Sequence, residues 1–245
     1  DFPDRGAGLK EFSSNNAIWE FNTVVDPPRW CYDLHRNSND VTLRFNLFEG
    51  GGGTSIHIDR TRNVNIYGNV IVSEGEADAL ENGCIDTAGQ NEDSPGAHFN
   101  DIHHNTCAKR HWGITVGDDT PSSVHDNILL GLAQGRDHPR NINLPGEGHS
   151  ADHNAYDADA AYHAVAIYDG TARYDTLGDW QAGTGNDAAS IEGPGGACEL
   201  ADPPGAGPDW DFDLHVTAGG CLTLGGTGVE VGAYGLTSCV GYLCP

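Results

Sequence analysis

The sequence predicts a secreted all-β protein, folded as a right-handed parallel β-helix (a solenoid) of about six coils with a C-terminal capping segment. Three observations predict this fold class. An asparagine-centred phrase recurs along the chain, a second short apolar segment follows each copy, and the pattern changes near Tyr174. One β-helix coil cannot bury its apolar face alone, so stacked copies of a short phrase are the expected signature.

The recurring phrase consists of an apolar residue, two positions, an asparagine, one position and a second apolar residue. Its asparagines are separated by 24, 23, 36, 22 and 27 residues, which fits one coil per interval with an insertion in the third. Each copy is expected to form a strand whose apolar side chains face the core. The copies are Trp19-Asn22-Val24, Leu43-Asn46-Phe48, Ile66-Asn69-Ile71, Ile102-Asn105-Cys107, Val124-Asn127-Leu129 and, in a weaker form, Ala151-Asn154-Tyr156.

The six asparagines are expected to stack in one column inside the helix. Successive coils lie about 4.8 Å apart, so identical amides at one level can hydrogen-bond along the axis. An amide also satisfies backbone groups at a buried turn, which favours a structural role over a catalytic one. Cys107 follows its asparagine by two residues and is predicted to point into the core as a buried, unreactive thiol.

A second strand is predicted after each asparagine phrase. Most copies have apolar outer residues and a polar or small middle residue, so the middle residues should point outward and form a column across the coils. The segments are Tyr32-Asp33-Leu34, Ile56-His57-Ile58, Ile85-Asp86-Thr87, Ile114-Thr115-Val116, Ile142-Asn143-Leu144 and Val165-Ala166-Ile167.

The chain is expected to form a single domain in two parts. Residues 1–173 would form the coils, and residues 174–245 the capping and closing segment, in which 175–181 is typical of a short helix. A cap is expected because an open β-helix end exposes unpaired strand edges.

Charge narrows the range of partners. Asp and Glu number 36 against 12 Lys and Arg, for a net charge of −24, and Lys10 and Lys109 are the two lysines. So acidic a surface repels nucleic acids and anionic membranes. The acidity fits either a solvated coat suited to high salt or the binding of multivalent cations. The apolar runs are too short for a membrane span.

Seven cysteines in a glycine-rich chain favour an oxidising, extracellular compartment. Their spacing does not match a zinc knuckle. The interpretation is therefore that the four C-terminal cysteines take part in disulfides, with the pairing left open. They are Cys198, Cys221, Cys239 and Cys244.

Several segments together resemble bacterial secreted parallel β-helix proteins of the pectate-lyase-like superfamily. The resemblance implies the fold and a polysaccharide or glycan partner. It does not choose an activity, because such proteins include polysaccharide lyases, glycosidases, epimerases and adhesins. The matching segments are 102–106, 112–114, 126–129, 177–181 with 185–187, and 231–234.

Titratable residues are concentrated on the outward column of the first three coils. Asp33 and His35 lie on one strand, His57 and Asp59 on the next, and Asp86 on the third. Histidine beside carboxylates is a competent proton carrier, and carboxylates can hold a divalent cation. Asp33, Asp59 and Asp86 are accordingly the candidate metal ligands, with Ca²⁺ as the implied cofactor.

Lyase chemistry on a uronic acid needs a base for the C5 proton and a neutraliser for the C6 carboxylate. The candidate bases are His57 and Lys109. The candidate neutralisers are Arg60, or a cation held by Asp59 and Asp86.

Other functions are left open. Hydrolysis would use Asp59 with Asp86 or Asp118 as a carboxylate pair. The outward column is also compatible with an ordinary solvated face. A further alternative is a non-catalytic surface, fibre-forming or adhesion module that associates end to end through strand edges.

Overall fold

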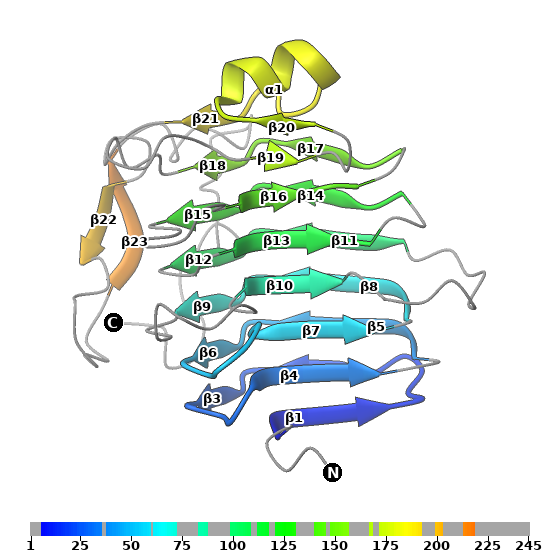
Figure 1. The fold of residues 1–245 in the computed structure, drawn as a ribbon. Coiled ribbons are helices and arrows are strands. Elements are labelled where there is room, and N and C mark those ends of the chain that lie inside the picture. Colours follow the sequence, from blue (N-terminus) through cyan, green and yellow to red (C-terminus); the bar gives the residue numbers. More distant parts are fainter. Residues whose placement is uncertain are drawn as a thin grey trace.

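The protein is an all-β parallel solenoid, which confirms the predicted fold class. Its strands stack as the rungs of three parallel sheets, and a short helix lies over the C-terminal end of the stack (Figure 1). The computed structural model describes residues 6–35, 38–59, 61–72, 83–87, 99–108, 112–117, 121–130, 140–145, 148–156, 167–168, 172–192, 199–202 and 213–218.

The three sheets take their strands from successive coils. The first sheet contains β1 (Ala7–Phe12), β4 (Trp30–His35), β7 (Ile56–Asp59), β10 (Gly83–Thr87), β13 (Trp112–Val116), β16 (Arg140–Asn143), β19 (Ile167–Tyr168) and β20 (Arg173–Tyr174). The second contains β2 (Ile18–Glu20), β5 (Asn39–Arg44), β8 (Arg62–Tyr67), β11 (Asn100–His103), β14 (Ser123–His125) and β17 (Ser150–Asp152). The third contains β3 (Thr23–Val25), β6 (Leu47–Glu49), β9 (Val70–Val72), β12 (Thr106–Ala108), β15 (Ile128–Leu130), β18 (Ala155–Tyr156) and β21 (Ile191–Glu192). A separate antiparallel pair joins β22 (Glu199–Asp202) to β23 (Asp213–Ala218).

The solenoid has fewer complete turns than the six or so coils expected from the sequence. In the described part of the chain, the turns from β4 to β15 have every strand flanked on both sides by parallel strands, which gives about four turns. The turns before and after them are end turns, because at least one strand of each, such as β2 or β17, ends its sheet.

Each asparagine phrase forms two strands in two sheets instead of the single strand that the alternation predicts. The chain bends between them, because the residue before each asparagine has a positive φ of 52° to 65°. Such left-handed residues reverse the side-chain alternation, so apolar residues on both sides of the bend face the core. The six residues are Phe21, Phe45, Gly68, His104, Asp126 and His153.

The predicted asparagine column is confirmed. The side-chain amide of each asparagine donates to Oδ1 of the next at 2.9 to 3.1 Å, from Asn22 as far as Asn154. From Asn46 onward the amide also donates to a carbonyl of the preceding coil, and Oδ1 accepts the backbone N–H of the previous asparagine. The column therefore satisfies the polar groups that the bends expose.

Asn69→Ala is expected to lower the free energy of unfolding by about 1–3 kcal/mol, because it strands the buried N–H of Asn46 and the carbonyl of Leu43. Denaturant titration measures the change. The matched control is Asn15→Ala, which removes an exposed hydrogen bond that Asn15 accepts from Asn39 and should cost less than about 0.5 kcal/mol. Equal losses in the two variants would contradict a structural role for the column.

A buried carboxylate closes each end of the core. At the N-terminal end Glu11 accepts hydrogen bonds from the Tyr32 hydroxyl at 2.8 Å and from Trp19 Nε1. At the other end Asp187 accepts from the Tyr156 hydroxyl at 3.0 Å and from Trp180 Nε1 at 2.8 Å. Asp187 also accepts the amide of Asn154 at 3.0 Å and so terminates the asparagine column.

The capping helix α1 (Leu177–Thr184) confirms the short helix expected there. Thr176 caps its N-terminus by accepting the backbone N–H of Asp179, and Gly185 ends it with a φ of 76°. Leu177 and Trp180 are buried against the core. The third sheet continues past the helix into β21, while the division of the chain at residue 173 stays a prediction.

Cys107 points into the core as predicted, but it is not a free thiol. It forms a disulfide with Cys84, and this pairing was not predicted from the sequence. Cys84 ends up beside Cys107 because β10 and β12 belong to the same turn. Cys31 is buried, and its Sγ lies 3.6 Å from the hydroxyl oxygen of Ser55. The four cysteines predicted to form disulfides lie outside the described residues.

Candidate functional site

The outward column of the first sheet has the predicted register. Asp33 on β4 lies opposite His57 on β7, and His57 lies opposite Asp86 on β10. In the neighbouring row His35 lies opposite Asp59. The five residues therefore occupy adjacent positions on three strands. They lie on the outward side, because the middle residue of each strand points away from the core.

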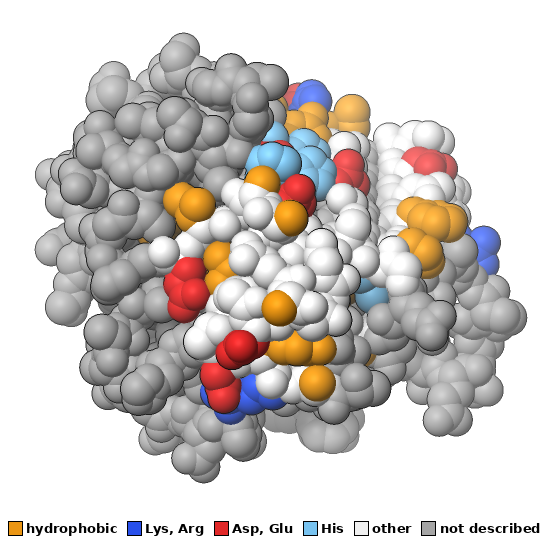
Figure 2. All heavy atoms as spheres, turned by 90° about the horizontal axis from the view of Figure 1, so that it is seen from above, with side chains coloured by type: hydrophobic (Ala, Val, Ile, Leu, Met, Phe, Trp, Pro, Cys, Tyr) orange, Lys and Arg blue, Asp and Glu red, His pale blue; other side chains and the backbone are white. Residues whose placement is uncertain are grey.

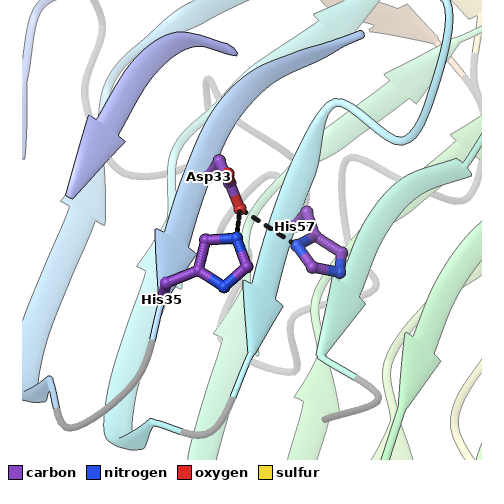
Figure 3. A group of neighbouring side chains, drawn as sticks. All are labelled: Asp33, His35 and His57. Carbon is purple, nitrogen blue, oxygen red and sulfur yellow. Dashed lines mark hydrogen bonds and ion pairs between the residues drawn. The ribbon is translucent and has the colours of Figure 1, made fainter. Parts of the chain in front are cut away.

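Asp33 is the centre of this face (Figure 3). Its Oδ1 lies 2.9 Å from His35 Nε2, on the same strand, and 3.1 Å from His57 Nδ1, on the next strand. The Asp33 side chain is fully covered although it lies on the outward side, whereas His35 and His57 remain 19% and 21% exposed. The buried carboxylate thus orients two imidazoles that solvent can reach.

A lysine contacts the same carboxylate. Lys10, opposite Asp33 on β1, places Nζ 2.8 Å from Oδ2. Burial alone would raise the pKa of Asp33, but hydrogen bonds from His57 and Lys10 outweigh it and hold that pKa below its usual value. Asp33 is therefore ionised at neutral pH.

Aromatic rings surround the two histidines. Trp30 stacks on His57 with ring centroids 4.8 Å apart, and Phe12 stacks on His35 at 5.4 Å. The guanidinium of Arg29 lies 4.2 Å above the Trp30 ring. Phe12 is 58% exposed, so the face offers an open apolar ring beside the polar cluster. None of the aromatic residues and neither cation was predicted as part of the site, although Lys10, Phe12 and Trp30 would have been found by extending the strand register to β1 and β4.

The predicted site residues are only partly brought together. Asp59 Oδ2 lies 3.2 Å from His35 Nδ1, on the side of the ring away from Asp33. Asp86 lies beside His57 in the register, two strands beyond Asp33. Arg60, Lys109 and Asp118 lie outside the described residues.

One group of potential metal ligands emerges from the described part of the chain. Asp33, His35 and His57 offer ligand atoms that all lie within 4.8 Å of one another. This set shares Asp33 with the predicted set of Asp33, Asp59 and Asp86 but replaces two carboxylates with imidazoles. A calcium ion at the predicted carboxylates stays a prediction.

A second histidine group, which sequence reasoning missed, lies on the second sheet. His103 and His125 occupy the same row of adjacent strands, and their rings stack in parallel at 5.0 Å. His103 Nδ1 lies 2.9 Å from His104 Nδ1. His125 contacts Asp126 at 2.7 Å and Asp101 at 3.1 Å. The signal was present in the sequence, because these residues lie one to four positions before two asparagines of the column.

The three histidines of this group differ in charge. Burial lowers the pKa of His103 to about 4 and also lowers that of His104. Burial opposes charge on His125 too, but its hydrogen bonds to Asp101 and Asp126 raise its pKa to about 9. At neutral pH the cationic ring of His125 therefore stacks on the neutral ring of His103. Viewed from the end that carries α1, histidine side chains gather beside acidic ones at one margin of the molecule (Figure 2).

Stability should depend on pH through His125. Because its folded pKa is raised, its contribution is fully present below about pH 6.5 and is lost as the pH rises through about 9. His125→Gln is therefore expected to cost on the order of 1 kcal/mol at pH 6.5, after allowance for solvent screening, and less at pH 10. Thermal denaturation across this range tests it, with His153→Gln as the control from the next coil. A difference that does not change with pH would contradict the assignment.

Comparison with models of known protein families, with curated proteins and with solved structures gives no match. The fold and the chemistry of the described residues are therefore the basis for assigning a function. Among those residues, no helix has both the length and the apolar character needed to cross a membrane.

His57 has the geometry of a general base. Its Nδ1 faces the Asp33 carboxylate, and the stacked Trp30 ring holds the imidazole in place. When Nδ1 carries the proton and donates it to Asp33, Nε2 bears a lone pair. A buried carboxylate that orients such a ring is the arrangement by which proteins prepare histidine for proton abstraction.

Proposed function

We propose that the protein is a secreted, polysaccharide-active β-helix protein that cleaves acidic glycans as a lyase, in the manner of the pectate-lyase-like superfamily that its sequence resembles. The observation that carries the proposal is the Asp33–His57 pair on an outward sheet face. An extended sugar chain can lie across the strands of such a face, and the exposed ring of Phe12 provides a surface on which a sugar can stack.

The reaction is a β-elimination on a uronic acid residue. His57 Nε2 takes the C5 proton, the C5–H electron pair forms a double bond to C4, and the C4–O bond breaks. The departing oxygen keeps that bond's electron pair and takes a proton from water. Asp33 stabilises the imidazolium that His57 becomes, which lowers the barrier to proton transfer.

The net charge of −24 opposes an anionic substrate, so positive charge near His57 is required. Arg29, whose guanidinium lies over the Trp30 ring, is proposed to supply it, because the charge of Lys10 is already paired with Asp33. Arg60, or a calcium ion at Asp59 and Asp86, remains a proposed alternative for binding the C6 carboxylate.

A screen of uronate-containing and neutral polysaccharides, each with and without Ca²⁺, tests this function. A lyase produces an unsaturated sugar that absorbs ultraviolet light, whereas a glycosidase yields reducing ends without that absorbance. Absorbance with a uronate polymer supports the proposal. Reducing ends alone would assign hydrolysis, and the absence of both products with every polymer would overturn catalysis.

A non-catalytic assembly module is the second candidate. The exposed large hydrophobic residues of the described structure are concentrated on the N-terminal turn, where Phe12, Ile18, Phe21 and Val25 are 42% to 58% exposed. Apolar surface at the end of a stack of strands favours end-to-end contact with a second copy. Sedimentation of the chain against Ile18→Lys and Phe21→Lys variants tests this, because a monomer at high concentration contradicts it.

A further inference from the structure

We propose that Asp33, His35 and His57 bind a first-row transition metal ion such as Zn²⁺, rather than Ca²⁺. The three residues bring one carboxylate oxygen and two imidazole nitrogens within 4.8 Å of one another. Imidazole nitrogen favours zinc, copper, nickel and iron, whereas calcium takes oxygen ligands.

The distances suit a small ion. In a tetrahedral zinc site with metal–ligand bonds of about 2.0–2.2 Å, neighbouring ligand atoms lie about 3.3 Å apart. Asp33 Oδ1 lies 2.9 Å from His35 Nε2 and 3.1 Å from His57 Nδ1. An ion would replace the protons now shared between these atoms, and it would draw together the two imidazole nitrogens, which lie within 4.8 Å of each other.

The surroundings of the three ligands support metal binding independently. His35 turns Nε2 toward the cluster while Asp59 contacts its other nitrogen at 3.2 Å, which is the carboxylate–histidine arrangement that orients metal-bound imidazoles. Lys10 binds Asp33 Oδ2, so Oδ1 remains directed at the two histidines. Trp30 stacks on His57 and limits its rotation.

Three protein ligands leave at least one coordination position for water or a substrate oxygen, as in zinc sites that are not purely structural. The partial exposure of both histidines places this position on the solvent side of the buried carboxylate. Metal binding itself does not depend on the protein's being an enzyme. If His57 is the base proposed above, the bound ion would displace the Asp33–His57 hydrogen bond and inhibit turnover.

Calorimetric titration of chelator-treated protein with ZnCl₂ tests the site. The wild type is expected to bind one ion with highest affinity, and His35→Ala and His57→Ala should each weaken that binding by at least about 10- to 100-fold. His103→Ala, from the second histidine group, is the matched control and should leave it unchanged. Circular dichroism verifies that each variant is folded, and the spectrum of bound Co²⁺ reports coordination by nitrogen.

The outcomes separate this site from others. Unchanged zinc affinity in both triad variants, or an equal loss in His103→Ala, would overturn the proposal. Tighter binding of Ca²⁺ than of Zn²⁺ at these residues would overturn the stated preference. If the protein binds zinc but its metal-free form cleaves no polysaccharide, the metal site stands and the lyase is refuted, so the two proposals fail separately.

Discussion

His57→Ala is expected to lower kcat on a responsive uronate polysaccharide by about 10²–10⁴-fold, the usual contribution of a positioned general base. KM should change far less, because the imidazole abstracts a proton and contributes little to binding of the sugar chain. Initial rates of ultraviolet absorbance, measured on chelator-treated protein, give both constants. Asp33→Asn should also lower kcat, because an amide can still contact the ring but cannot balance the charge that His57 acquires.

Thr115→Ala is the matched control, because Thr115 occupies the same outward row two strands beyond His57. It should retain the wild-type kcat. Turnover of His57→Ala within about threefold of the wild type would eliminate the base assignment. In that case the cluster would be a binding or structural feature of the face.

Asp187→Ala is expected to lower the free energy of unfolding by about 3 kcal/mol, which would be the largest stability effect of any single substitution considered. The carboxylate accepts hydrogen bonds from Asn154, Tyr156, Trp180 and Ser190, and its removal leaves buried donors without acceptors. The asparagine column and the capping helix lose their common attachment at the same time. Chemical denaturation measures the loss.

The free energy of unfolding lost in Asp187→Ala should also depend on pH. Burial raises the pKa of Asp187 above its usual 3.8, in spite of the hydrogen bonds that oppose this shift. The folded state therefore binds the proton more tightly than the unfolded chain, so this contribution is fully present below about pH 3.8 and declines as the pH rises through the raised pKa. Asp175→Ala, which removes an exposed ion pair with Arg173, should cost about 0–1 kcal/mol at every pH. Similar losses in both variants would refute the role assigned to Asp187.

The features that repeat with every coil could be predicted from the sequence alone. The spacing of the asparagines identified the column, and the alternation around Asp33, His57 and Asp86 placed these residues in one outward row. Both follow from local physics, since a strand has a fixed side-chain period of two and a stack repeats its buried positions at one level. The fold class and the register of the first sheet could therefore be predicted without coordinates.

The bend at each asparagine and the disulfide, by contrast, depend on how the whole chain packs. The alternation around each asparagine concealed the bend, because a left-handed residue such as His104 carries no distinctive side chain. The pairing of Cys84 with Cys107 depends on how the chain between them crosses from the first sheet to the third.

The candidate site was decided in the same way. The sequence placed His35 and His57 on adjacent strands, but rotamers and packing turned both rings toward Asp33. Burial then distinguished the carboxylates, because Asp33 is fully covered while Asp59 remains partly exposed. Burial and side-chain direction arise from contacts between residues about one coil apart in sequence, and these depend on the packing of the whole stack.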